Sequence, residues 1–148
     1  MMKFSDLAER KRINDQVAVE VMRHKQPFES QQIPCPDGKP GCAVMHLGLF
    51  DANGVRIPKY VYDLQDAWKV VTALSMDRDF VLSYVSPSHF GDGSSEPGHW
   101  MCYFAGSPDV TAETAPEAIC RAALLAVASD RANGYTPKYM ESENSHER

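Results

Sequence analysis

The chain has 148 residues, a length typical of one folded domain with a single hydrophobic core. Its composition, with 43% hydrophobic and 24% charged residues, is that of an ordinary globular protein. A formal net charge of −5 argues against a general nucleic-acid binder, which needs a basic face, and no stretch approaches the roughly 18 apolar residues that span a membrane. We therefore expect neither a nucleic-acid partner nor a membrane partner.

The N-terminal part is expected to contain a lead-in and one helix. Residues 1–12 mix charges of both signs without an apolar run, so we expect a loose or partly helical lead-in and no signal peptide. On that expectation the chain stays in the cytoplasm, where its four cysteines are reduced. Asn14 is expected to cap a helix that runs to about His24, with Val17 and Val21 on one face.

A strand region follows. Residues 34–41 are rich in proline and glycine, which is typical of a loop. The apolar stretch 42–50 is expected to form a strand, with a turn at 51–54 and a short return strand at 55–57.

The next element is a helix that begins after Asp63, a good capping residue, and runs to about Ser75. Leu64, Trp68 and Val71 follow helical spacing, which indicates one buried face. We interpret Trp68 as a core anchor because it is in register with the two aliphatic residues.

Two strands with a long connection come next. Residues 80–85 and 99–105 are expected to pair as an antiparallel hairpin. The connection 86–98 is rich in glycine, proline and serine, and we expect a long mobile loop.

The strongest helix signal lies at 114–129. Thr114 and Glu117 form a capping-box pair around Pro116, which is tolerated in a first turn. The helix is apolar almost all round, so we expect it to be the main core element, with Cys120 as a small hydrophobe inside it. Its small residues allow close approach to a sheet: Ala118, Ala122, Ala123 and Ala126.

Together these elements predict an α+β fold, an α-β-α sandwich with a small antiparallel sheet and helices on both faces. We expect the lead-in at 1–12, one sandwich domain over 13–130 and a flexible C-terminal tail over 131–148, where the sequence is polar and rich in turns.

Three stretches resemble the phage ABA-sandwich domain family. They are Tyr-Asp-Leu-Gln-Asp-Ala-Trp-Lys-Val-Val at 62–71, His-Trp-Met-Cys-Tyr-Phe at 99–104 and Thr-Ala-Pro-Glu-Ala-Ile-Cys-Arg-Ala-Ala-Leu at 114–124. Weaker similarity reaches back through 58–60 and 17–22. The resemblance implies a helix-sheet-helix fold and an origin in a bacteriophage or prophage. It implies no activity and no catalytic residues.

Cys35, Cys42 and His46 are candidate metal ligands with the spacing Cys-x6-Cys-x3-His. Structural zinc sites usually open with a tighter Cys-x2–4-Cys knuckle, whose turn aims both thiolates at one ion. A fourth ligand would have to come from elsewhere in the chain: His24, His99 or Cys102. We expect no cofactor, and zinc is the alternative that this spacing leaves open.

Catalytic motifs are missing from the sequence. It contains no Gly-x-Ser-x-Gly nucleophile elbow and no glycine-rich phosphate loop after a strand. We therefore expect that the protein is not an enzyme. A Cys/His-dependent enzyme is an alternative, because four cysteines and five histidines permit such a pair.

The connection between the paired strands carries the candidate binding residues His89, Phe90, Asp92 and His99, since long connections often bind partners and aromatic side chains anchor interfaces. The other interpretation is a plain connector. We interpret the chain as an accessory protein that binds a host or phage protein in the bacterial host cytoplasm, with inhibition of an immune complex (anti-defence activity) as one version. A small-ligand-binding or sequestering protein, with a pocket between sheet and loop, is the alternative. A homodimer through sheet edges is a further expectation.

Overall fold

The computed structural model describes residues 4–33 and 46–140, and side chains from Leu7 to Gln31 and from Gly48 to Met140. The helical elements are α1 (Phe4–Gln16), the π-helix η1 (Val17–Val21), α2 (Leu64–Leu74) and α3 (Ala115–Ala132). The strands are β1 (Glu29–Ile33), β2 (His46–Phe50), β3 (Phe80–Val85), β4 (Ser88–His89), β5 (Ser95–Glu96), β6 (His99–Phe104) and β7 (Val110–Ala112).

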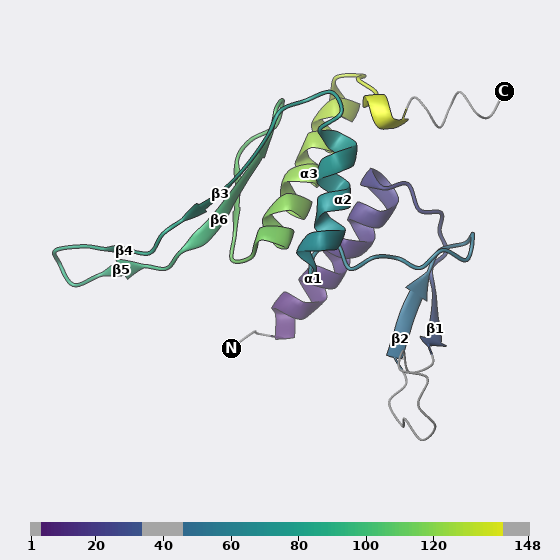
Figure 1. Cartoon of the computed structure of the whole chain (residues 1–148), viewed down its shortest axis with the longest axis horizontal. Helices are drawn as coiled ribbons and strands as arrows, with labels where there is room; N and C mark the ends of the chain where they lie inside the picture. Colours follow the sequence, from purple (N-terminus) through teal and green to yellow (C-terminus); the bar gives the residue numbers. More distant parts are fainter. Residues whose placement is uncertain (1–3, 34–45, 141–148) are drawn as a thin grey trace.

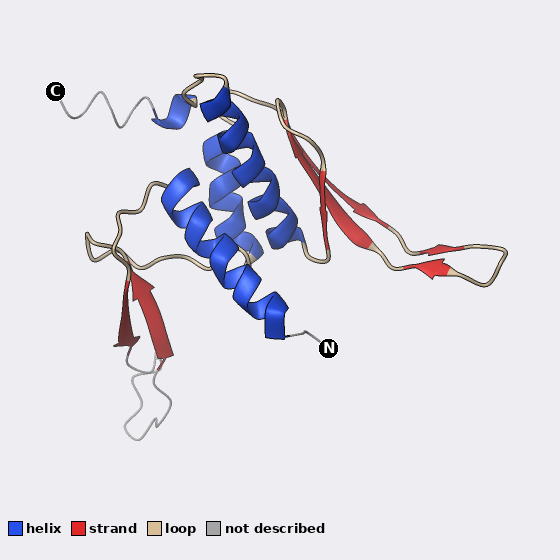
Figure 2. Cartoon of the chain, turned by 180° about the vertical axis from the view of Figure 1, so that it is seen from behind, coloured by secondary structure: helices blue, strands red, loops and turns tan. Residues whose placement is uncertain are grey.

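Helix α3 is the central element of an α+β sandwich, as the sequence predicts. It contacts β6 and β7 of the antiparallel sheet β3-β6-β7, and it also contacts α2, η1 and α1. Figures 1 and 2 show the helices stacked together beside this sheet, with the β1-β2 hairpin set apart from both. The α+β class and the small antiparallel sheet are therefore confirmed.

The layers differ from the expected order in one respect. Among the described elements, the helices all lie on one side of the β3-β6-β7 sheet, not on both. The side chains that face α3, such as Cys102 and Phe104, are fully buried. The opposite face presents a mixture of apolar and polar side chains, including Val81, Ser83 and Thr111, and Val81 is 49% exposed. Such a mixed face is compatible with solvent on an antiparallel sheet.

The small residues of α3 explain why it packs on several sides at once. Four of its five buried alanines have no exposed surface, and neither does Cys120. The Thr114 hydroxyl caps the helix by accepting from the Glu117 N–H at 3.4 Å. The Glu117 carboxylate does not complete the expected capping box but accepts from Arg10 Nε at 3.2 Å. This contact joins the start of α3 to α1.

Helix α2 is capped by Asp63, whose Oδ1 accepts from the N–H groups of Gln65 at 2.8 Å and Asp66 at 3.3 Å. Its buried face differs from the predicted one, because Leu64 and Trp68 are about half exposed. The interpretation of Trp68 as a core anchor is therefore wrong. The residues that α2 buries are Ala67, Val70, Val71 and Leu74.

The N-terminal helix begins at Phe4, so the expected lead-in over 1–12 is helical from that residue onward. Asn14 lies inside the helix and does not cap it. Its side chain instead donates to Pro58 O at 3.1 Å and accepts from the Val61 N–H at 2.9 Å. The Asn14 side chain therefore makes long-range hydrogen bonds in place of a helix cap, and these bonds hold the 58–61 segment against α1.

The C-terminal segment does not form a free tail as far as Met140. The Tyr139 hydroxyl donates to Val21 O at 2.7 Å, Tyr135 hydrogen-bonds to Asp77, and Met140 is buried. The expectation of a flexible tail is therefore wrong for 131–140, and its remainder, 141–148, lies outside the described residues.

The predicted strand at 42–50 is present as β2 from His46, and residues 42–45 lie outside the described ranges. It pairs antiparallel with β1, which the sequence analysis missed, in the register Glu29 opposite Phe50. The expected return strand at 55–57 is reduced to one bridge between Arg56 and Phe50.

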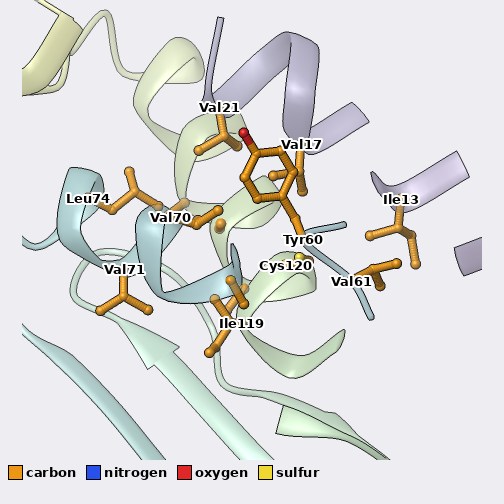
Figure 3. Close-up of a cluster of buried hydrophobic side chains, with 14 of the residues drawn as sticks. Ile13, Val17, Val21, Tyr60, Val61, Val70, Val71, Leu74, Ile119 and Cys120 are labelled. Carbon is orange, nitrogen blue, oxygen red and sulfur yellow. The ribbon is translucent and has the colours of Figure 1, made fainter. Parts of the chain in front are cut away.

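The hydrophobic core lies between the helices and the sheet. Figure 3 shows that its side chains come from distant parts of the chain and point toward one another. They include residues of α1, η1, the 60–61 segment, α2 and α3: Ile13, Val17, Val21, Tyr60, Val61, Val70, Val71, Leu74, Ile119 and Cys120.

Candidate functional site

The connection between β3 and β6 forms a projecting arm. The two strands pair from Phe80 opposite Phe104 to Val85 opposite His99, as predicted. Beyond them the chain does not stay a loop, because Ser88 and His89 of β4 pair antiparallel with Glu96 and Ser95 of β5. We call residues 86–98 the arm. Figures 1 and 2 show it extending away from the helices.

The tip of the arm is built around Phe90, whose side chain is 52% exposed. The Phe90 N–H donates to Ser94 O at 2.9 Å, and the Gly93 N–H donates to Phe90 O at 3.1 Å. Gly93 has a φ of +88°, a conformation that favours glycine. The aromatic ring is thus presented by a hydrogen-bonded turn.

Asp92 has a structural part in that turn. Its Oδ1 accepts from the Ser94 N–H at 2.9 Å and from the Ser94 hydroxyl at 2.6 Å. These hydrogen bonds lower the pKa of Asp92, so the carboxylate stays ionised at neutral pH. His89, Phe90 and Asp92 therefore lie close together at the tip, whereas His99 begins β6 at the base of the arm.

The base of the arm contains an aromatic contact that sequence reasoning missed. Tyr84 packs against Trp100 with ring centroids 5.1 Å apart. The Tyr84 side chain also lies on Gly98, where an added Cβ would approach the tyrosine Oη to 2.1 Å. Glycine is thus needed at 98 to let Tyr84 close over the backbone where the arm begins.

The proposed zinc ligands cannot be placed as a set. Cys35 and Cys42 lie outside the described residues, and His46 begins β2 with its side chain outside them. Of the three candidate fourth ligands, Cys102 is buried within β6 and His24 has both ring nitrogens engaged. The described residues contain no group of three or more metal-binding side chains. Zinc at Cys35, Cys42 and His46 stays a prediction.

The two described cysteines are poorly suited to nucleophilic catalysis. Both are fully buried, Cys102 in β6 and Cys120 in α3. Burial raises the pKa of Cys102 to about 12 and raises that of Cys120 further. At neutral pH both thiols are therefore protonated, and the thiolate is the reactive form of cysteine.

A buried polar network joins three distant segments, and the sequence analysis did not find it. His24 Nδ1 lies 2.8 Å from Asp51 Oδ2, and His24 Nε2 lies 2.9 Å from the Tyr60 hydroxyl. The carboxylate can only accept, so Nδ1 carries a proton. Tyr60 is 1% exposed, and burial strongly raises its pKa. Both ring nitrogens are occupied within the network and the tyrosine hydroxyl is buried, which indicates a structural part for these three side chains.

Asp51 makes the stability of this network depend on pH. The hydrogen bond from His24, followed by those from the Val55 and Asn53 N–H groups, lowers the pKa of Asp51 in the folded chain. A depressed folded-state pKa stabilises the protein above the unfolded pKa, about 4, and the stabilisation is lost as pH falls through the folded value.

We therefore expect Asp51→Asn to lower the free energy of unfolding at pH 7, and the difference from wild type to shrink below about pH 4. Urea unfolding at a series of pH values measures this difference. Asp109→Asn, at an exposed position just before β7, is the matched control and is expected to change little. An equal deficit of Asp51→Asn at pH 3 and pH 7 would show that the carboxylate charge is not what matters.

A cleft of about 650 Å³ lies beside the α2-β3 turn and the end of α3. It is not the pocket between sheet and arm that the small-ligand alternative assumed. Its charged groups mostly satisfy one another: an Arg78 Nη donates to Asp130 Oδ2 at 2.6 Å. Arg78 Nε and Asp77 Oδ1 lie 3.7 Å apart and have no hydrogen-bond partner. The cavity is therefore a polar cleft over a charged cluster that anchors the C-terminal segment.

Across residues 4–33 and 46–140, no helix has the length and apolar character needed to cross a membrane.

Comparisons with known proteins place the chain among phage proteins. Its structure is similar to the crystal structure of a phage protein from Bacillus cereus, with a TM-score of 0.45 and 22% sequence identity over 85% of this chain and 93% of that one. No curated protein matches the chain significantly. The phage ABA sandwich domain model matches residues 15–124, which include α2, the β3-β6 hairpin and the first half of α3. The chain therefore belongs to the phage ABA sandwich domain family.

Proposed function

We propose that this protein is a phage- or prophage-encoded accessory protein that acts by binding a host or phage protein, with the tip of the arm as the contact. The observation that carries the proposal is the half-exposed Phe90 at the end of a hydrogen-bonded, projecting arm. An aromatic side chain on a pre-ordered turn loses little conformational entropy when it enters a pocket.

The charge of the arm indicates the chemistry of the partner. Residues 86–98 contain Asp92 and Glu96 and no lysine or arginine. A fitting surface is an apolar pocket that accepts Phe90, with basic side chains at its rim. Binding of this kind requires no catalytic group, so the proposal includes no enzymatic activity.

Anti-defence activity is the finer version of the proposal. An inhibitor of a bacterial immune complex needs only to occupy a surface of that complex in the host cytoplasm, and membership of a phage family supports this setting. The discriminating measurement is phage growth on matched hosts with and without the immune system. We expect the protein to improve phage growth on the host that has the immune system. Phe90→Ala should remove this improvement and leave growth on the other host unchanged.

The alternative function is small-ligand binding in the cleft beside the α2-β3 turn. The polar and charged residues that line this cleft, among them Asp77, Arg78 and Asp130, favour this alternative, because a polar ligand needs such groups to bind. A ligand that binds only the folded chain raises its melting temperature. A thermal-shift screen against nucleotides that finds no stabilising compound would remove the main reason to consider it.

The binding proposal is tested by removing residues 87–97. Because Val85 pairs with His99, this deletion leaves Ser86 and Gly98 as a two-residue connection between paired strand ends, a favourable hairpin geometry. We expect the shortened protein to fold and to lose its partner in a pull-down from infected cells. Phe90→Ala is expected to weaken the same interaction at least about tenfold.

Leu7→Ala is the control, since Leu7 is 45% exposed and lies on α1, away from the arm. It should retain the partner that the two arm variants lose. Equal recovery of the partner by all variants would exclude the arm as the contact, and recovery of no specific partner by wild type would count against the function itself.

A further inference from the structure

Strand β3 is an open edge of the three-stranded sheet. The strand order is β3-β6-β7, and in the described chain nothing pairs with the outer side of β3. The Ala105 N–H donates to Asp79 O, so Asp79 and Ala105 form a hydrogen-bonded pair. In an antiparallel ladder every second residue from position 79 onward is then also hydrogen-bonded to β6. This alternation leaves the backbone N–H and C=O groups of Phe80, Leu82 and Tyr84 directed away from the sheet.

The edge carries none of the usual protection against pairing. Soluble proteins commonly guard edge strands with charged side chains, proline or a bulge. Strand β3 reads Phe-Val-Leu-Ser-Tyr-Val, with no charge and no proline, and it pairs with β6 without a bulge. Its side chains Val81, Tyr84 and Val85 are 36–52% exposed. The backbone and the side chains are thus both available to another strand.

An uncharged stripe on α2 lies alongside this edge. Leu64, Trp68 and Thr72 are spaced four residues apart and exposed, so they share one side of the helix. Trp68 meets the Phe80 ring edge-on, with centroids 5.9 Å apart, which places the stripe next to β3. The free backbone groups and the exposed Trp68 therefore belong to one surface, which we call the β3 edge surface.

We propose that the β3 edge surface binds a second copy of this chain, by antiparallel pairing of β3 with β3 across a two-fold axis at Leu82. In this register Leu82 faces Leu82 of the other copy, and Phe80 faces Tyr84. The backbone groups that point outward on one copy meet the same groups on the other, which is the condition for a hydrogen-bonded antiparallel ladder.

The charges around the strand favour a second copy as the occupant. Position 79, the charged residue before β3, falls opposite Val85, so the two Asp79 carboxylates do not face each other. A two-fold axis perpendicular to the sheet keeps both sets of helices on one side and brings the two α2 stripes toward each other. Leu64 and Trp68 then lie over the joined strands, which accounts for their exposure in the single chain.

The dimer leaves the arms free. Because the paired strands run in opposite directions, the two arms extend from opposite ends of the joined sheet. The inference therefore goes beyond the proposed partner binding and uses a different surface.

The test measures mass in solution by light scattering over a range of protein concentrations. The expected mass is twice the 16.5 kDa of one chain. Tyr84→Lys places a charge opposite Phe80 twice in each dimer, so we expect it to raise the dissociation constant about 100-fold. Phe90→Lys is the matched control, because Phe90 is equally exposed but lies at the arm tip, and it should leave the dimer intact.

The register is tested by cross-linking, in a background with Cys35→Ser and Cys42→Ser. Leu82→Cys puts two thiols at the axis, where opposed residues are about 5.5 Å apart between Cα atoms, a separation that a disulfide spans. Mild oxidation is expected to give a covalent dimer with Leu82→Cys and much less with Val81→Cys, which faces position 83. A wild-type mass of one chain at every concentration overturns the proposal, as does a dimer that Tyr84→Lys leaves intact and Leu82→Cys does not cross-link. Neither result tests the proposed partner binding by the arm.

Discussion

Replacing Phe104 with alanine is expected to lower the free energy of unfolding by about 3–5 kcal/mol, a large share of the stability of a domain this size. Phe104 ends β6 with no exposed surface and packs on Phe80, with ring centroids 5.0 Å apart. It faces α3, whose closely packed alanines have no side chain long enough to refill the space. Most of the cavity should therefore remain open, which is the costly case.

Urea unfolding followed by circular dichroism measures this loss. Phe90→Ala removes the same number of atoms from a half-exposed ring at the arm tip and is expected to change stability by less than about 0.5 kcal/mol. A loss below about 1 kcal/mol for Phe104→Ala would mean that the sheet and α3 close over the missing ring, contrary to the rigid packing inferred for this layer.

The second large effect is expected for Glu117→Ala, which should destabilise the protein by about 3 kcal/mol. The side chains of Glu117 and Arg10 are 11% and 10% exposed, and Arg10 Nε donates to Glu117 Oε1 at 3.2 Å. Removing the carboxylate takes away the 3.2 Å contact of a nearly buried guanidinium, and the carboxylate of Glu113, 3.7 Å from Arg10, is exposed. The loss of a partner of a buried charge is what makes this change costly.

Two further variants separate the contribution of the Arg10–Glu117 ion pair to stability from the contributions of its single side chains. Glu113→Ala removes a carboxylate with an 89% exposed side chain and is expected to be nearly neutral, because exposed ion pairs contribute little. The double variant Arg10→Met with Glu117→Met removes both charges and should be less destabilised than Glu117→Ala. A double variant that unfolds more easily than the single one would show that Arg10 stabilises the fold through contacts other than this ion pair.

Local signals in the sequence predicted the elements whose residues determine their own conformation. Thr114 and Asp63 cap the helices that follow them, because a side-chain oxygen two or three residues before a free N–H needs no distant partner. The β3-β6 hairpin was predicted for a similar reason, since two short runs of β-branched and aromatic residues close together in the sequence indicate strands that can pair. The family resemblance rests on these same segments.

Predictions failed where contacts between distant segments decide the structure. The charged N-terminal segment gave no strong helix signal, because its contact between Arg10 and Glu117 is long-range. Asn14 was predicted to cap a helix, but its amide hydrogen-bonds to the 58–61 segment. On α2, the large Trp68 suggested one buried face, but the alanine-rich surface of α3 admits the neighbouring face instead. Strand β1 is polar and is specified by its pairing with β2.

The candidate site was likewise predicted only where its signal is local in the sequence. The sequence singled out Phe90 because a glycine- and serine-rich connection is a local pattern, but the short β4-β5 ladder that orders it was not visible in so few residues. The contact between His24, Asp51 and Tyr60 joins three segments that are far apart in the sequence and follow no common motif. The sequence therefore did not predict it.

The placement of the arm has a consequence for how such a protein evolves. Strands β4 and β5 pair with each other and, in the described chain, with no other strand, so exchanging their side chains opens no void among the packed layers. Helix α3 is in the opposite position, since almost any larger residue at its buried alanines would collide with a neighbour. A phage lineage can therefore change the side chains of the tip while inheriting the helical body nearly unaltered.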